Sequence, residues 1–569
     1  MYKQVLDPVG DSLGLSTIFA VLPLITLFVL LGGFKLKAHV AALWSLAVAL
    51  LVAIIVYSMP VGQALDAGAE GAVFGLFPIM FIVINAIWIF NMLERSGHFA
   101  VIRRSFGRLS DDQRVQAVLI AFCFGALLEA LAGFGTPVAI CSVMLIGLGF
   151  QPIKAAAVAL VANTAPVAFG AIAVPITTLA PLANLPKDDL GAMVGRQTPL
   201  LALVVPLVLV GMVDGRRGIK AAWPAAMVCG LAFAIGQFAC SNYLSVELAD
   251  IVASLLAAGA VIALLRVWRP GDVLSVPTGA RPAMAGGATG VDQRRFEKEA
   301  KLRADADADA GADGELKRDT PGAMLIAFSP YLIIIVVFAL AQIHWLPFFD
   351  WLDARTKLFD WPGLNVLNGK GEPATAVTFK FNWANAAGTL LLLSGLLSMI
   401  SLRVRPRRAL ESYAATLNQL KFAILTVATV LALAYVMNLS GQTITIGSWL
   451  AGAGTAFALL SPILGWLGVA VTGSDTSSNA LFGALQVSAA EKAHLSPMLM
   501  AASNSSGGVL GKMISPQNLA IGAAAVGMAG QEGELFRKVV KWSLILLAAM
   551  VVIVYLQSTS VLSWMVVGS

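Results

Sequence analysis

Apolar runs long enough to cross a lipid bilayer recur along this chain, and they constrain its fold more than any other feature. A membrane-spanning helix needs about 20 apolar residues, and the first runs of this kind cover 13–33, 36–58 and 71–93. Only 12% of the 569 residues are charged, whereas a soluble domain has about 25%. We therefore expect an all-α polytopic membrane protein with about 12–14 membrane segments.

One polar stretch interrupts this pattern in the second half. Residues 472–479 read Thr-Gly-Ser-Asp-Thr-Ser-Ser-Asn and lie between the apolar runs 457–471 and 480–487. Polar groups at membrane depth are tolerated only where they line a cavity or pack inside protein. We interpret the stretch as the tip of a re-entrant hairpin over about 459–488; an ordinary turn outside the membrane is the alternative.

A repeat links this hairpin to an earlier segment. Six residues of the first half recur after 340 or 341 positions: Gly125, Gly133, Thr136, Asn163, Gly170 and Pro175 match Gly465, Gly473, Thr476, Asn504, Gly511 and Pro516. These residue types break or cap helices. Interrupted apolar segments at corresponding positions of two repeats are typical of the substrate site of a secondary transporter.

The repeat divides the chain into four parts. We expect a first inverted repeat over 1–213, two connecting spans over 214–267, a linker over 268–321 and a second inverted repeat over 322–569. Each repeat has a hairpin followed by a broken helix: about 115–150 and 155–183 in the first, and 459–488 and 498–530 in the second. In the first repeat, we expect the helix to break at 163–166 and again at Pro175. In the second, we expect the break near 504–508. The linker has too few apolar residues to form an ordered structure by burying apolar surface, so we expect it to be flexible.

Charged loops predict the orientation. Five arginines between 95 and 114 mark a cytoplasmic loop by the positive-inside rule, and Asp66 and Glu70 are expected in the loop on the opposite side. The N-terminus is then outside and the linker cytoplasmic. The same rule makes the first hairpin enter from the cytoplasm and the second from outside. Inverted topology thus follows from charge without reference to the repeat.

Three charged residues lie within the repeated apolar regions, namely Glu129, Asp475 and Lys512. A charge at the bilayer centre costs a few kcal/mol and is a functional candidate by default. We expect Glu129 to carry the coupling proton, because an apolar environment favours a neutral carboxyl, with Asp475 as the second proton-coupling residue. The alternative is a buried ion pair that only locks the two halves together.

Hydroxyls, amides and one ammonium at the tips and breaks suit a small oxygen-rich anion. Helix N-termini and Lys512 would attract its carboxylate. The expected substrate-binding residues are Thr136, Asn163, Thr164, Ser474, Thr476, Ser477, Asn504, Ser505 and Lys512.

Other functions find less support. The four cysteines and four histidines are scattered, so we expect no metal and no cofactor besides the coupling proton. Basic residues sit in short loops, so we do not expect the protein to bind nucleic acid. We expect contact with membrane lipid, and the sequence leaves open whether the protein forms a homo-oligomer. An enzymatic function is disfavoured, because the sequence lacks a nucleophile–His pair, a metal-ligand cluster and a phosphate loop. A channel is also disfavoured, but only flux measurements would distinguish it from a transporter. Sodium-coupled carboxylate transport is the main alternative, because Ser, Thr and Asn also coordinate Na⁺.

At these same residues the sequence resembles the L-lactate permease family of bacterial transporters. The resemblance rests on the stretches 125–139, 163–170, 472–481 and 511–516. It implies proton-coupled uptake of L-lactate across the bacterial inner membrane, with D-lactate and glycolate as further substrates, and a fold with paired re-entrant hairpins. The Asp/Ala-rich linker departs from the family pattern. Without the resemblance, the residues indicate only a secondary transporter for a small polar, anionic solute.

Overall fold

The protein is a polytopic helical membrane protein, as the sequence predicts. The computed structural model describes residues 1–34, 36–107, 109–133, 135–274, 320–342, 351–352, 354–368, 371–374, 377–528 and 531–568. Within these ranges ten helical segments are long and apolar enough to cross a membrane, or eleven if one bent pair counts as a single span. This number is below the expected 12–14, because neighbouring segments merge into continuous helices and others are short arms.

The first helices form a packed group at the N-terminal side of the molecule. Asp66 and Glu70 do not lie in a loop, as the sequence predicted, but in helix α3. A Cβ atom on Gly71 would lie 2.5 Å from the carbonyl oxygen of Leu431, so α3 packs closely against α18 (Pro406–Ser440), and Glu70 is buried. The elements are α1 (Leu13–Phe28), η1 (Val29–Gly33), α2 (Ala38–Leu51), η2 (Val52–Val56), α3 (Val61–Phe74), η3 (Gly75–Met80), α4 (Phe81–Arg95) and α5 (His98–Gly107).

The next segment contains an antiparallel helix pair whose arms meet at Gly133–Gly135. Helix α7 packs against α8. Gly135 has a φ of +83°, and a Cβ atom there would lie 2.4 Å from Ile521 Cδ1, so only glycine allows this turn beside α23 (Pro516–Ala525). The elements are α6 (Gln113–Gln116), η4 (Ala117–Phe124), α7 (Gly125–Ala132) and α8 (Thr136–Gly147).

A broken helix follows, and its two parts are bent by 65°. Helix α9 (Pro152–Ala162) ends at Asn163, and the short η5 (Val167–Phe169) leads into α10 (Gly170–Leu182). The break lies at 163–166, where the sequence predicted it. A second irregularity precedes Pro175: residues 171–173 have positive φ values of 46°, 58° and 55°.

Helices α11 to α13 complete the first half. Helix α12 folds back on itself at Asp214–Gly215, and a Cβ atom on Gly230 would lie 2.5 Å from the carbonyl oxygen of Leu203. The two arms of α12 therefore pack against each other, as expected for two successive spans. The bounds are α11 (Lys187–Val194), α12 (Thr198–Tyr243) and α13 (Ala249–Val267). Of the expected linker 268–321, residues 275–319 lie outside the described residues.

The second half begins with α15 and a loop that carries short strands. Strand β1 (Tyr2–Lys3) pairs in parallel with β3 (Val366–Leu367), and β2 (Lys357–Asp360) pairs antiparallel with β4 (Thr378–Phe381). The first pairing places the N-terminus and this loop on the same side of the molecule. The helices here are α15 (Pro321–Gln342), α17 (Ala387–Ser401), α18 (Pro406–Ser440), α19 (Gln442–Leu450) and η7 (Ala451–Ala456).

A second antiparallel helix pair turns at Gly473–Ser474. Gly473 has a φ of +75°, and the Ser474 hydroxyl caps the next helix by accepting from the Ser477 N–H. The elements are α20 (Phe457–Thr472), α21 (Asp475–Lys492), α22 (Pro497–Gly511), η8 (Lys512–Ile514), α23 (Pro516–Ala525), α24 (Glu532–Gln557) and η9 (Ser563–Met565).

The predicted break at 504–508 is wrong, because α22 is helical throughout that stretch and the chain breaks instead at 512–515. The small residues serve packing. A Cβ atom on Gly507 would lie 2.2 Å from the carbonyl oxygen of Pro462, and one on Gly465 would lie 2.0 Å from that of Asn504. Helices α20 and α22 are therefore in backbone contact.

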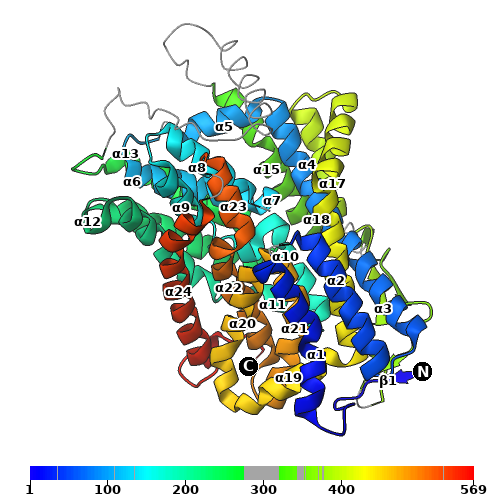
Figure 1. The fold of residues 1–569 in the computed structure, drawn as a ribbon. Coiled ribbons are helices and arrows are strands. Elements are labelled where there is room, and N and C mark those ends of the chain that lie inside the picture. The colour runs from blue at the N-terminus through cyan, green and yellow to red at the C-terminus, as the bar shows by residue number, and fades with distance from the viewer. Residues whose placement is uncertain are drawn as a thin grey trace.

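Charged groups gather at the end of the molecule that the sequence predicted to be cytoplasmic. Arg114 pairs with Asp112 and Asp214, and Lys154 Nζ donates to the carbonyl oxygen of Val213 at 2.6 Å. At the other end, the Tyr2 hydroxyl donates to the carbonyl oxygen of Ser440. In Figure 1, α5 and α6 lie near one end, and β1 and α19 lie near the other. Both halves contain an antiparallel helix pair followed by a broken helix; a two-fold inverted relation between them stays a prediction.

Candidate functional site

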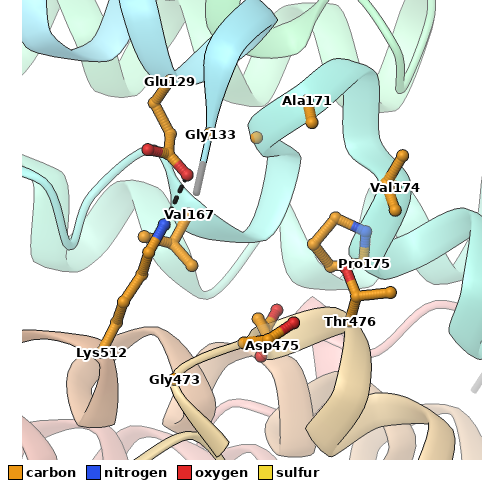
Figure 2. Close-up of a pocket in the computed structure, with 12 residues that line it drawn as sticks. Glu129, Gly133, Val167, Ala171, Val174, Pro175, Gly473, Asp475, Thr476 and Lys512 are labelled. Atoms are coloured by element: carbon orange, nitrogen blue, oxygen red, sulfur yellow. Dashed lines mark hydrogen bonds and ion pairs between the residues drawn. The ribbon is translucent and has the colours of Figure 1, made fainter. Parts of the chain in front are cut away.

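A cavity of about 40 Å³ lies where the two hairpin tips meet the broken helices. This volume exceeds the roughly 10–15 Å³ that one water molecule needs. Figure 2 shows the segments of the first half on one side of the cavity and those of the second half on the other. The lining residues are Glu129, Gly133, Val167, Gly170, Ala171, Val174, Pro175, Gly473, Ser474, Asp475, Thr476 and Lys512.

Glu129 and Lys512 form an ion pair across this cavity. Lys512 Nζ lies 2.5 Å from Glu129 Oε1, and the two side chains are only 8% and 3% exposed, respectively. Figure 2 shows them pointing toward one another from α7 and η8. Asn163 Nδ2 donates to the other carboxylate oxygen, Oε2, at 2.9 Å. Both oxygens of Glu129 are thus satisfied, and the charges of the pair cancel.

Gly170 makes room for this carboxylate. A Cβ atom on Gly170 would lie 2.9 Å from Glu129 Oε1, and one on Gly133 would lie 3.3 Å from the same atom. At Gly170 and Gly133, the start of α10 and the first hairpin tip therefore approach Glu129 with backbone only. Any side chain at Gly170 would displace the carboxylate from its lysine.

Asp475 is the second carboxyl of the cavity and the first residue of α21. Its Oδ2 accepts from the Ser505 hydroxyl at 2.6 Å and from Asn479 Nδ2 at 3.5 Å. Its Oδ1 packs against Gly508 and has no hydrogen-bond partner among the described residues. The positive end of the helix dipole stabilises a negative charge at this position.

An amide network supports Asp475 from behind. Asn479 Nδ2 donates to the carbonyl oxygen of Pro175 at 3.1 Å, Asn504 Nδ2 donates to Asn479 Oδ1 at 2.8 Å, and Gln486 Nε2 donates to Asn504 Oδ1 at 3.1 Å. All three amides are buried. Because the network includes a carbonyl of α10, it ties the second hairpin to the broken helix of the first half.

The structure separates the predicted site residues into three groups. Glu129, Ser474, Asp475, Thr476 and Lys512 line the cavity. Asn163 and Ser505 lie one layer behind and hold the two carboxyls. The other four are not among the lining residues: Thr136 begins α8, Thr164 lies in the turn after α9 and donates to the carbonyl oxygen of Val161, Ser477 belongs to the cap of α21, and Asn504 belongs to the amide network.

Sequence reasoning missed the apolar wall of the cavity. This wall consists of Val167, Ala171, Val174 and Pro175, all from the segment after the break at 163–166. The break itself was the available signal, since residues that follow an unwound turn face the cavity that the turn lines.

Asp250 is a further buried acidic residue, but it is not among the lining residues of the cavity. It is 1% exposed and its Oδ1 accepts from Gln237 Nε2 at 2.9 Å, while Oδ2 has no partner among the described residues. In the sequence it stands three residues after Glu247, at the start of an apolar run.

Comparison with known proteins agrees with the motifs. The family model described as L-lactate permease matches residues 16–561. The chain is 40% identical to an L-lactate permease of Salmonella typhi over 584 residues, which covers 100% of both chains. It is 41% identical to the glycolate permease GlcA of Escherichia coli (98% of both chains) and 39% identical to an L-lactate permease of Bacillus subtilis (99% of this chain and 100% of the relative). These matches span the two hairpins, both broken helices and every residue of the cavity, and they show that this chain belongs to the L-lactate permease family of membrane transporters.

Proposed function

We propose that this protein is a secondary active transporter that takes up L-lactate together with protons across the bacterial inner membrane, and that it also carries D-lactate and glycolate. The relatives named L-lactate permease and glycolate permease support the substrate class. The observation that carries the proton coupling is the buried Glu129–Lys512 pair inside a cavity between the two hairpin tips.

The cavity offers a partner for each part of a 2-hydroxymonocarboxylate. The Lys512 ammonium and the N-terminus of α21 attract the carboxylate. The hydroxyls of Ser474 and Thr476 and the Asp475 carboxyl can hydrogen-bond the 2-hydroxyl group. Val174 and Pro175 face the same space and suit the methyl group of lactate, which glycolate lacks.

Coupling follows from exchange of partners at Lys512. In the empty site Glu129 neutralises the ammonium. When the substrate carboxylate takes that place, Glu129 is left buried without a cation, and an unpaired buried carboxylate is costly enough to take up a proton instead. The empty site holds Glu129⁻ and Lys512⁺, and the loaded site holds neutral Glu129, Lys512⁺ and the lactate anion. In each state the charges of Glu129, Lys512 and any bound lactate add up to zero. The site can therefore change from facing one side of the membrane to facing the other in both states.

Asp475 is the second proton site in this proposal. Among the described residues it has no cation partner within hydrogen-bonding distance, and its hydrogen bonds come from the Ser505 hydroxyl and the Asn479 amide. A proton on Asp475 in addition to the one on Glu129 would make transport electrogenic. A single proton on Glu129 makes it electroneutral.

The first test is uptake of labelled L-lactate into sodium-free proteoliposomes, with and without an imposed inward proton gradient. We expect accumulation only with the gradient. Equilibration without accumulation would instead indicate a facilitator. Uptake that begins only after Na⁺ is added would replace the proton by sodium as the coupling ion.

We also propose the inverted arrangement of the repeats 1–213 and 322–569, with the N-terminus outside and the linker cytoplasmic. The four native cysteines are buried, so an introduced cysteine can be labelled selectively. A membrane-impermeant thiol reagent should label Lys3→Cys in intact spheroplasts and Lys220→Cys only after lysis. The opposite pattern would reverse the orientation.

A further inference from the structure

A second cavity, of about 280 Å³, lies apart from the first at the end of the molecule that contains the Arg114 cluster. It is bounded by the start of α9, by α12 close to its fold at Asp214–Gly215, and by the first half of α24. Helix α9 packs against both α12 and α24. The lining residues are Gln151, Ile153, Lys154, Ala157, Gly211, Met212, Lys538, Lys541 and Trp542.

The charges of this cavity are all positive. Among the described residues that line it, the ionisable ones are Lys154, Lys538 and Lys541, and none is a carboxylic acid. Lys154 Nζ is held by a neutral carbonyl, that of Val213, at 2.6 Å. Lys541 Nζ lies 5.2 Å from the centre of the Trp542 ring. Three lysines from two separate helices thus line one space, with no ion pair to an acidic side chain among the described residues, and this arrangement suits a phosphate group.

The surroundings of the cavity indicate a lipid rather than a free ion. Beyond Lys541, helix α24 exposes Leu544, Ile545 and Val552, which are 49%, 56% and 55% exposed. In a span, such side chains face acyl chains. We infer that the cavity lies where the headgroup layer meets the hydrocarbon, and its lining residue Trp542 is of a type enriched at that level.

We propose that this cavity binds the phosphate headgroup of an anionic phospholipid from the cytoplasmic leaflet, with the acyl chains lying along the exposed face of α24. Basic pockets between membrane helices on the cytoplasmic side recognise such headgroups. The bound lipid bridges α9, α12 and α24. Asn163 caps the C-terminal end of α9, and its side-chain amide donates a hydrogen bond to Glu129. The lipid would therefore contact a helix that leads directly to the transport site.

The test measures binding of fluorescent phosphatidylglycerol to the purified full-length protein in a neutral detergent, with phosphatidylcholine as the uncharged comparison. The variant Lys154→Gln/Lys538→Gln/Lys541→Gln should bind phosphatidylglycerol at least about tenfold more weakly, because each lysine near a membrane surface strengthens attraction to anionic lipid severalfold. The matched control Arg405→Gln/Arg407→Gln/Arg408→Gln removes the same charge from exposed positions at the start of α18 and should bind as the unmodified protein does. Size-exclusion profiles verify that each variant is folded.

Two results would overturn the proposal. The first is equal phosphatidylglycerol binding by the lysine variant and the arginine control. The second is displacement of the lipid by inorganic phosphate at the same concentration, which would make the cavity a site for the free ion. Neither measurement involves lactate, so failure of this proposal and failure of the proposed transport function are distinguishable.

Discussion

Gly465 and Asn504 bring two helices of the second half into backbone contact: a Cβ atom on Gly465 would lie only 2.0 Å from the carbonyl oxygen of Asn504. Helix α20 of the second hairpin thereby packs directly on α22. The next residue of α22, Ser505, places its hydroxyl 2.6 Å from Asp475 Oδ2 on the other arm of the hairpin. Close packing of small residues therefore determines where a cavity carboxyl lies.

Replacing Gly465 with alanine should destabilise the protein, because the added carbon meets a backbone atom that cannot move without shifting a helix. We expect a cost of about 1–3 kcal/mol, typical of overpacking, seen as a lower unfolding temperature in detergent. Gly259→Ala is the matched control, since a Cβ atom at this exposed helical position meets nothing within 4 Å. Equal unfolding temperatures for both variants would contradict the close contact.

Replacing Glu129 with glutamine should abolish proton-driven accumulation of lactate while the protein stays folded. The amide oxygen can still accept from Lys512, but it cannot take up a proton when the substrate arrives. Exchange of internal for external lactate should persist, because the loaded site has the same net charge as in the unmodified protein. The measurement compares accumulation and exchange in the same proteoliposomes, and retained accumulation would exclude Glu129 as the proton carrier.

Lys512→Met should be the more damaging single change, because it leaves Glu129 buried without its cation. Breaking a buried ion pair costs about 3–5 kcal/mol, so yield and unfolding temperature should both fall. The double variant Glu129→Gln/Lys512→Met should recover most of this stability but no lactate transport. If the double variant were as unstable as Lys512→Met, the loss would come from packing of the lysine stem and not from the pair.

Ser505→Ala should weaken lactate transport, since Asp475 loses the hydroxyl that orients it. A hydrogen bond to a charged group is worth about 1.5–3 kcal/mol, which corresponds to a rise in the KM of uptake of about tenfold or more. The neighbouring hydroxyl of Ser506 is buried and has no partner among the described residues, so Ser506→Ala should leave the KM unchanged. Equal KM values for the two variants would remove Ser505 from the site.

Asp112, which lies just before α6, should make stability depend on pH. Burial by itself would raise the pKa of Asp112, but hydrogen bonds from Arg114 and from the Leu274 N–H outweigh it and hold the pKa below its ordinary value. The stabilisation is then fully present above pH 4, near the unfolded pKa of about 3.9, and is lost as the pH falls through the folded pKa. Asp112→Asn should lower the unfolding temperature at pH 7, and the difference from the unmodified protein should shrink at pH 3. The exposed neighbour Asp111→Asn should have no effect at either pH.

The sequence by itself determined the class of protein and the residues most worth testing. Hydropathy acts locally, so a run such as 13–33 predicts a span without knowledge of its neighbours, and the structure has a helical segment with those bounds. The cost of burying a charge is local in the same sense, which is why Glu129, Asp475 and Lys512 could be selected in advance. The polar stretch at 472–479 and the proline at 166 likewise mark a tip and a break from their own chemistry.

Only the tertiary structure decided how these residues meet. Glu129 and Lys512 are 383 positions apart, and their pairing depends on how two hairpins and two broken helices pack. The same applies to the hydroxyls: Ser474 lines the cavity, whereas Thr164, in the turn after α9, donates back to the carbonyl oxygen of Val161, and the local sequence alone does not distinguish the two outcomes. Glycine and serine also have two uses in a membrane helix, to break it or to let another helix approach. At 504–508 the approach of α20 decides between them, and that contact comes from a part of the chain that no local pattern specifies.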